Sequence, residues 1–283
     1  MSGRRTTVAL VDSGLGLLGF ADALLAARPD LDLVLSLDPD HMPWGSRSVE
    51  QVTERVLAGV EAAVPLGPDA VVIACNTGSV QALSTVRGRL EPAVPVVGTV
   101  PAIRPAAATG GPVTVWATPS TTGSPYQRDL IARFAYGVDI QEVACPGFAA
   151  AVEAGDDAAV DAAIAAAVAA TRPGTSAVVL GCTHYPLVRD RIEAALAPGV
   201  MVLDSTEAVA RQTLVRLAGR ATASRDAVPA DRASADATSA IGLPAEGAGT
   251  VRVLLSGRIG ALPTAAAGYA AGRRVLHGAA LTA

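Results

Sequence analysis

The stretches VVIACNT at residues 71–77 and VVLGCTH at 178–184 indicate how this chain folds. In both, an apolar run ends in a cysteine that is followed by polar residues. Continuous apolar runs of this length are typical of parallel strands buried on both faces of a sheet. The two cysteines, Cys75 and Cys182, are 107 residues apart, which indicates that one structural unit occurs twice in the chain.

Neighbouring segments repeat at nearly the same spacing. VALVDSG at 8–14 parallels VTVWATP at 113–119, an offset of 105 residues. VPVVGTVPA at 94–102 begins 19 residues after the first cysteine, and VMVLDSTEA at 200–208 begins 18 residues after the second. We therefore predict two copies of one α/β unit. The alternative, that strands of parallel sheets merely share a composition, stays open at this point.

Short β-branched runs alternate with longer helical patterns along the chain, which predicts open α/β sheets with mostly parallel strands. Residues 221–249 have no periodicity and are predicted to form a long surface loop. The predicted strands are 7–11, 33–37, 70–74, 94–98, 113–117, 138–143, 177–181, 200–203 and 251–255, and the predicted helices are 17–27, 48–64, 79–90, 123–135, 156–170, 187–196 and 206–218.

Composition excludes several classes of protein. A chain of 283 residues that is 51% hydrophobic can bury a core without disulfides. Its three cysteines suit a reducing compartment, and its net charge of −4 without a basic stripe argues against nucleic acid as a partner. All 22 basic residues are arginine, so a lysine Schiff base with pyridoxal phosphate and a Walker-type lysine are excluded. No signal peptide or membrane segment is evident, so we expect a soluble cytoplasmic protein.

The two cysteines are the candidate reactive groups. Ligands of open α/β sheets bind beyond the carboxyl ends of the strands, where both cysteines lie. Asn76 and Thr77 follow the first cysteine, and Thr183 and His184 follow the second; their donors, at a helix start, favour anions and would lower a thiol pKa. A buried cysteine is often only a small apolar side chain, but the duplicated pattern favours a functional role.

Two thiols that face each other across a cleft suit one reaction in particular. One thiolate can remove a proton from a stereocentre while the opposing thiol delivers a proton to the other face, which inverts the configuration. The carbanion needs no cofactor if preorganised donors stabilise the developing charge. The sequence therefore predicts cofactor-independent acid–base chemistry and no metal site.

Nine strings extend this pattern over about residues 7–218, and with them the chain resembles the cofactor-independent glutamate racemases of the aspartate/glutamate racemase superfamily. LGCTHYPL is the most specific of them. The strings are VDSG (11–14), MPWG (42–45), IACNT (73–77), VPVVG (94–98), ATPSTTGSPYQ (117–127), ACP (144–146), VEAG (152–155), LGCTHYPL (180–187) and DSTEAVARQ (204–212).

The resemblance implies two similar open α/β domains related by pseudo-twofold symmetry, with the active site between them. The first domain would comprise residues 1–98 plus 205–283, and the second residues 99–204. The resemblance also implies conversion of glutamate between its enantiomers, a supply of D-glutamate for peptidoglycan, no cofactor and a homodimer.

Site residues follow by position from the same strings. Cys75 and Cys182 would be the catalytic acid/bases, with Asp12 near the first, His184 near the second, and Glu153 bound to His184. Cys145 is assigned no chemistry. The residues implied to contact substrate are Asp12, Ser13, Trp44, Gly45, Asn76, Thr77, Thr118, Thr121, Thr183 and His184, with Thr118 and Thr121 at the side-chain carboxylate.

Some positions depart from the family pattern. Leu17 stands where a glycine is usual and puts the geometry of its loop in question, Trp44 replaces a tyrosine, and Gly78 replaces an alanine. The string LSGRIGALP at 255–263 stands where a TGDP-like string is expected. Three alternatives therefore stay open: a superfamily racemase for aspartate or a hydantoin, a non-catalytic ligand-binding relative, and a redox or metal protein. The absence of Cys-x-x-Cys and of paired metal-ligand spacing disfavours the last.

Overall fold

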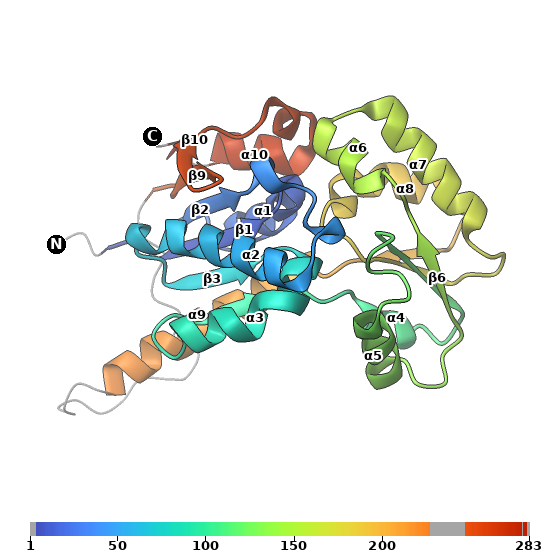
Figure 1. The fold of residues 1–283 in the computed structure, drawn as a ribbon, viewed down its shortest axis with the longest axis horizontal. Coiled ribbons are helices and arrows are strands. Elements are labelled where there is room, and N and C mark those ends of the chain that lie inside the picture. The colour runs from blue at the N-terminus through green and yellow to red at the C-terminus, as the bar shows by residue number, and fades with distance from the viewer. Residues whose placement is uncertain (1–3, 227–246, 279, 282–283) are drawn as a thin grey trace.

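A computed structural model describes residues 4–226, 247–278 and 280–281 of the chain. It has a mixed α/β architecture built on two sheets (Figure 1). The first sheet has the order β10-β9-β2-β1-β3-β4, with β11 paired to β9, and only the β9–β10 pair is antiparallel. Its strands are β1 (Thr7–Asp12), β2 (Asp32–Leu37), β3 (Ala70–Ile73), β4 (Val96–Gly98), β9 (Thr250–Leu255), β10 (Arg258–Gly260) and β11 (Ala280–Leu281).

The second sheet repeats the core of the first. Its order is β6-β5-β7-β8, all parallel, which matches β2-β1-β3-β4 strand for strand. Its strands are β5 (Val113–Ala117), β6 (Ile140–Ala144), β7 (Ala177–Leu180) and β8 (Met201–Leu203). The two cysteines follow β3 and β7, which hold equivalent places in the two sheets, as the repeat predicts. This strand membership supports our proposal that the domains are 1–98 plus 205–283 and 99–204.

Helices cover both faces of the first sheet, which explains its uninterrupted apolar strands. Along β1, Val8 and Leu10 join the core formed with α1, whereas Ala9 and Val11 join the core formed with α2 and α3. Because both faces are buried, residues 8–11 of β1 are all apolar, between Thr7 at its start and Asp12 at its end. The helices are α1 (Leu18–Ala27), α2 (Val49–Ala63), α3 (Asn76–Leu90), α4 (Ile103–Ala107), α5 (Pro125–Phe134), α6 (Phe148–Ala154), α7 (Asp157–Ala170), α8 (Arg189–Ala195), α9 (Thr206–Asp226) and α10 (Ala270–Gly278).

The structure differs from the sequence prediction in a few elements. Helix α9 continues to Asp226, so the predicted loop is wrong for residues 221–226, whereas 227–246 lie outside the described residues. The expected return of the chain at 251–255 is confirmed by the pairing of β9 with β2. Four short helices and strands were not predicted, namely α4, α6, β10 and β11, together with the nine-residue helix α10.

The hairpin of β9 and β10 has a recognisable cause. Ser256 and Gly257 both have positive φ, 45° and 82°, as a two-residue turn with the twist of a hairpin requires. A Ser-Gly pair after the apolar run at 251–255 is the signal that would have predicted β10.

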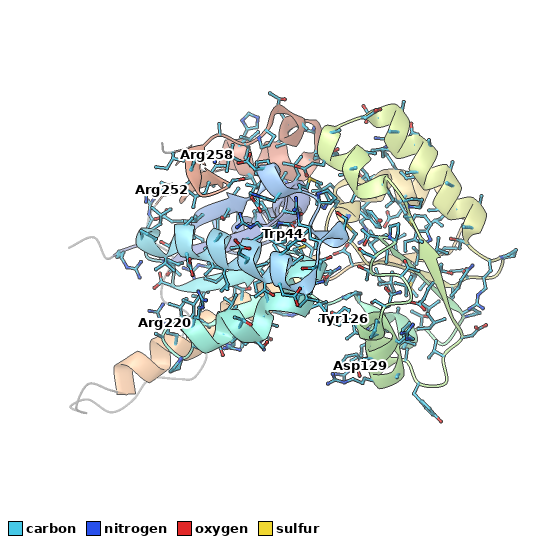
Figure 2. All side chains as sticks on the ribbon, viewed as in Figure 1. Trp44, Tyr126, Asp129, Arg220, Arg252 and Arg258 are labelled. Carbon is cyan, nitrogen blue, oxygen red and sulfur yellow. The ribbon has the colours of Figure 1, made fainter. Side chains whose placement is uncertain are left out.

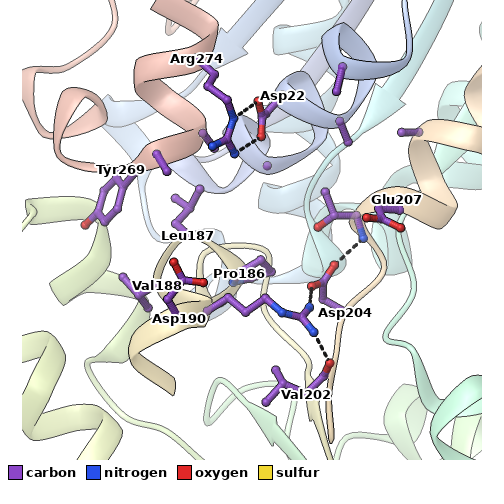
Figure 3. A pocket seen from close by; sticks show the side chains of 18 of the residues that line it. Asp22, Pro186, Leu187, Val188, Asp190, Val202, Asp204, Glu207, Tyr269 and Arg274 are labelled. Carbon is purple, nitrogen blue, oxygen red and sulfur yellow. Dashed lines mark hydrogen bonds and ion pairs between the residues drawn. The ribbon is translucent and has the colours of Figure 1, made fainter. Parts of the chain in front are cut away.

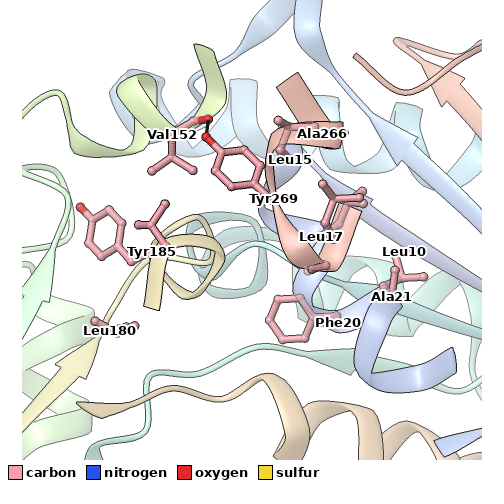
Figure 4. Packing of buried hydrophobic residues seen from close by; sticks show 14 of the residues in the cluster. Leu10, Leu15, Leu17, Phe20, Ala21, Val152, Leu180, Tyr185, Ala266 and Tyr269 are labelled. Carbon is pink, nitrogen blue, oxygen red and sulfur yellow. Dashed lines mark hydrogen bonds between the residues drawn. The ribbon is translucent and has the colours of Figure 1, made fainter. Parts of the chain in front are cut away.

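Leu17, which departs from the family pattern, is completely buried and has an ordinary helical backbone with φ −67°. Figure 4 shows it in the cluster that contains Phe20, Ala266 and Tyr269. The leucine therefore adds to the hydrophobic core behind its loop, and the glycine that is usual at this position is not needed for the backbone.

Arginines carry surface ion pairs. Arg220 pairs with Asp69 at 3.0 Å and Arg258 with Asp40 at 2.7 Å, on two sides of the first domain (Figure 2). Exposed pairs of this kind contribute little to stability. Among the described residues, no helix combines the length and the apolar character that crossing a membrane requires.

Candidate active site

A cavity of about 330 Å³ lies between the two sheets and contains both thiols in its lining. Cys75 comes from the end of β3 and Cys182 from the end of β7. The structure also places in this lining the predicted substrate contacts Ser13, Trp44, Gly45, Asn76, Thr77, Thr118, Thr121, Thr183 and His184. Asp12 and Glu153 are not in the lining and stand behind it, against residues that are.

Cys75 lies in a buried, electronegative environment. It directly precedes α3, and only 8% of the residue is exposed. Burial, followed by the Asp12 carboxylate, raises the pKa of the Cys75 thiol well above its usual value, although a hydrogen bond from the Gly78 N–H acts in the opposite direction. The expectation that a helix start lowers this pKa is therefore wrong for Cys75, because desolvation outweighs the helix amides.

Asp12 is itself fully buried behind this cysteine. Burial raises its pKa to about 6, despite the opposing effect of His184 and of a hydrogen bond from the Ser13 N–H. The carboxylate is therefore poised near neutrality and can exchange a proton with the adjacent thiol.

The second thiol has a different partner. Cys182 Sγ lies 3.9 Å from Nδ1 of His184, whose Nε2 lies 2.9 Å from Oε2 of Glu153. Burial opposes the charged imidazolium, but the interactions with Cys182 and Glu153 raise the pKa of His184 well above its ordinary value. The two thiols are therefore in chemically different environments, since Cys182 contacts an imidazole and Cys75 lies beside a carboxylate.

Hydrogen bonds join the two halves of the molecule beside the cavity. Asn76 Nδ2 donates to the Gly181 carbonyl at 2.7 Å, and Thr183 Oγ1 donates to Asp12 Oδ2 at 3.3 Å. Asn76 Oδ1 is buried and has no partner among the described residues. Since buried polar atoms are nearly always paired, this oxygen is a ready acceptor for a ligand ammonium or hydroxyl group.

Glu153 makes a further connection between the halves. Its Oε2 accepts a hydrogen bond from the Leu15 N–H at 2.7 Å in addition to its contact with His184. A Cβ placed on Gly14 would lie 2.3 Å from the same oxygen, so the backbone of this loop approaches the carboxylate closely and needs a glycine there.

Trp44 forms an apolar wall of the cavity. The residue is 1% exposed, and its Nε1 donates to Asp38 Oδ2 at 3.1 Å. Asp38 was not predicted as a site residue. It also accepts a hydrogen bond from Ser256 Oγ at 2.8 Å. Ser256 belongs to the string at 255–263 that departs from the family pattern, so this string helps to hold Asp38 and, through it, Trp44. The signal that could have found Asp38 is its position directly after β2, which parallels Asp12 at the end of β1.

Cys145 lines the same cavity, which sequence reasoning did not anticipate. Burial raises the pKa of its thiol to about 12. Cys145 is therefore a neutral thiol at physiological pH, in keeping with the absence of an assigned role.

A larger cavity, of about 1250 Å³, lies between α1, α9, α10 and the segment that leads into α8 (Figure 3). Its walls carry ion pairs such as Asp22–Arg274 and Arg189–Asp204 and no cysteine. The reactive groups thus distinguish the smaller cavity as the candidate active site.

Comparisons with known proteins agree with this geometry. Residues 21–213 match the family model described as Asp/Glu/Hydantoin racemase. The glutamate racemase of Roseiflexus sp. is 36% identical over 72% of this chain and 77% of the relative, and that of Erwinia tasmaniensis is 38% identical over 74% and 76%. A crystal structure of Escherichia coli glutamate racemase with L-glutamate and the activator UDP-MurNAc-ala has a TM-score of 0.71 and 30% identity, and covers 94% of this chain and 92% of that chain.

The relatives, together with the repeated α/β fold and the cavity between its sheets, thus identify an enzyme of the isomerase class. The chain belongs to the Asp/Glu/Hydantoin racemase family.

Proposed function

We propose that this protein interconverts L- and D-glutamate without a cofactor, using Cys75 and Cys182 as paired acid/bases. The observation that carries this proposal is that the thiols line one cavity of about 330 Å³, each supplied by one half of a repeated fold. A base and an acid on opposite sides of one carbon are what inversion by proton transfer requires.

In the proposed reaction, the thiolate of one cysteine takes the α-proton as the C–H electron pair passes to the carbanion. The opposing thiol then gives its proton to the other face, and the roles of the cysteines are exchanged in the product complex. For Cys182, the charged His184 stabilises the thiolate form, with Glu153 holding the imidazole. For Cys75, Asp12 with its pKa of about 6 is the group that can accept the thiol proton.

The remaining lining residues suit an acidic amino acid. Hydroxyl groups of Thr118 and Thr121, 3.1 Å apart, offer donors for the side-chain carboxylate, and Trp44 with Gly45 would form the opposite wall. Thr77 and Thr183 stand beside the thiols and would hold the α-carboxylate, and Asn76 Oδ1 would accept from the α-ammonium group. Ser13 and His184 would complete the contacts, whereas Asp12, which is fully buried behind the lining, would act through Cys75 and not on the substrate. Relatives named glutamate racemase favour glutamate over the alternatives of aspartate and a hydantoin.

A supply of D-glutamate for peptidoglycan, a cytoplasmic location and a homodimer are the wider consequences of this proposal. They rest on the resemblance to the glutamate racemases alone, since the relatives' names give only the activity.

The test is a circular-dichroism assay of the purified protein, without added cofactor, on each enantiomer of glutamate and of aspartate and on a hydantoin. We expect racemisation of glutamate from either side, with α-deuterium incorporated in D₂O. Turnover of aspartate or of the hydantoin, without turnover of glutamate, would show that glutamate is not the substrate. No exchange with any of the compounds would indicate a non-catalytic relative.

A further inference from the structure

Ser120 lines the cavity, but it is not among the residues that the family resemblance implies to contact substrate. It belongs to the turn after β5, which is held by hydrogen bonds from the Thr121 and Thr122 N–H groups to the Thr118 carbonyl at 2.9 and 3.0 Å. Within that turn, Thr118 Oγ1 lies 3.1 Å from both Ser120 Oγ and Thr121 Oγ1. The three hydroxyls therefore form one hydrogen-bonded chain.

The chain leaves a proton available to a ligand. The three hydroxyl groups carry three protons but form only two hydrogen bonds with one another, so one proton is left over. It belongs to Ser120 when Thr118 donates to Ser120 and Thr121 donates to Thr118. Thr118 is the only hydrogen-bond partner of the Ser120 side chain among the described residues. A hydroxyl at the end of such a chain is also polarised by the bonds behind it, which strengthens its donation to an anion.

Ser120 reaches across the mouth of the cavity to the other half of the molecule. A Cβ placed on Gly45 would lie 2.8 Å from Ser120 Oγ, compared with 3.9 Å from Thr118 Oγ1. Of the three hydroxyls, that of Ser120 is thus nearest to the wall formed by Trp44 and Gly45. The lack of a side chain at Gly45 leaves room for the hydroxyl.

Few other side chains at this wall can bind an anion. The indole N–H of Trp44 already donates to Asp38, so it offers nothing to the cavity. Among the described residues no arginine lines the cavity, and its histidine, His184, is engaged by Cys182 and Glu153. A carboxylate between the wall and the turn must therefore rely on hydroxyl and backbone donors.

We propose that Ser120 is a specificity-determining residue that donates a hydrogen bond to a substrate carboxylate, and that Gly45 keeps its hydroxyl in that position. This inference rests on the proposed function, since it takes the substrate to be an acidic amino acid. The Ser120 hydroxyl strengthens the binding of the substrate relative to a residue without a hydroxyl at position 120. It leaves the proton transfers at the two thiols unchanged.

The test compares Ser120→Ala with Ser84→Ala, an identical change at an exposed position of α3 outside the cavity. Because hydrogen bonds to charged groups are stronger than neutral ones, we expect the KM for glutamate to rise about tenfold in Ser120→Ala, with kcat within about twofold of the parent. Ser84→Ala should match the parent in both constants. Equal KM values for the two variants would overturn the inference.

A double-mutant cycle tests the role of Gly45. A methyl group at position 45 forces the Ser120 side chain into another rotamer, so Gly45→Ala should raise the KM for glutamate. In the double variant with Ser120→Ala, the fold-increase in KM should be well below the product of the fold-increases in the two single variants. Fully multiplicative effects would contradict the proposal. Thermal melts of all variants identify any that fail to fold. If the parent protein itself does not racemise glutamate, the proposed function fails, whereas an active parent with a silent Ser120→Ala removes only this inference.

Discussion

Trp44 occupies the space that a side chain at residue 78 would need. A Cβ on Gly78 would lie 3.1 Å from Cζ3 of Trp44 and 3.1 Å from Cγ2 of Val56, both of them buried. A methyl group at residue 78 would therefore press on the ring of Trp44 as well as on Val56, and from this we predict that the two departures from the family pattern, tryptophan for tyrosine and glycine for alanine, are coupled.

Gly78→Ala should consequently destabilise the protein and disturb the wall. Overpacking of this degree costs about 1–3 kcal/mol, against which the better helix propensity of alanine recovers only about 0.5–1 kcal/mol. We expect a net loss of about 1 kcal/mol in chemical denaturation and a higher KM. Combining it with Trp44→Tyr should restore part of the lost stability; a stabilised Gly78→Ala protein with unchanged KM would refute the coupling.

Gly16→Ala should abolish activity. A Cβ at this position would lie 2.4 Å from Thr183 Oγ1, 2.5 Å from Asp12 Oδ2 and 2.9 Å from His184 Nδ1, so the methyl group would push apart the groups that serve both thiols. The matched control is Gly88→Ala on α3, where a Cβ meets nothing within 4 Å. That control should keep full activity and gain about 0.5–1 kcal/mol of stability from helix propensity. Steady-state kinetics and thermal melts measure both effects, and an active Gly16→Ala enzyme would show that the two halves of the protein do not close as described.

Asp12→Asn should change how stability depends on pH. Burial raises the pKa of Asp12 from 3.8 to about 6, so its native-state contribution is fully present below pH 3.8 and is lost as the pH rises through about 6. The asparagine variant does not pay this cost of ionisation. Its free energy of unfolding relative to the parent should therefore increase, by up to about 3 kcal/mol, between pH 4 and pH 7.

Denaturant titrations of both proteins at several pH values in this range give that difference directly. The diagnostic quantity is its slope with pH, since the lost hydrogen bonds with Ser13 and Thr183 add an offset that does not vary in the same way. A difference independent of pH would mean that Asp12 does not titrate near 6.

Cys75→Ala and Cys182→Ala should each lower racemisation by at least about a thousandfold, because each removes one of the two groups that transfer protons. Cys145→Ala provides the matched control in the same cavity, and we expect it to stay within a few-fold of the parent. The circular-dichroism assay measures all three, with thiol titration of the parent as a check that the cysteines are reduced. A large loss of activity in Cys145→Ala would show that Cys145 takes part in the reaction and that our assignment of the two catalytic thiols is wrong.

The repeat, most of the strands and the position of both thiols at strand ends could be predicted from the sequence. These properties are local: a strand buried on both faces is mostly apolar, as β3, β7 and residues 8–11 of β1 are. The polar residues after such a strand mark the edge of the sheet where ligands bind. The short helices escaped prediction because elements of a few residues carry too little periodicity, and β10 escaped because the Ser256-Gly257 turn signal was not used.

Several contacts between site residues became evident only in the folded protein. The Asp38–Trp44 bond, the approach of Ser120 to Gly45 and the bridge from Glu153 to Leu15 each depend on how segments from different parts of the fold are brought together. The upward shift of the Cys75 pKa likewise depends on the tertiary structure. A helix start favours the thiolate in any sequence, but the desolvation that outweighs it exists only once the two halves of the protein enclose the sulfur.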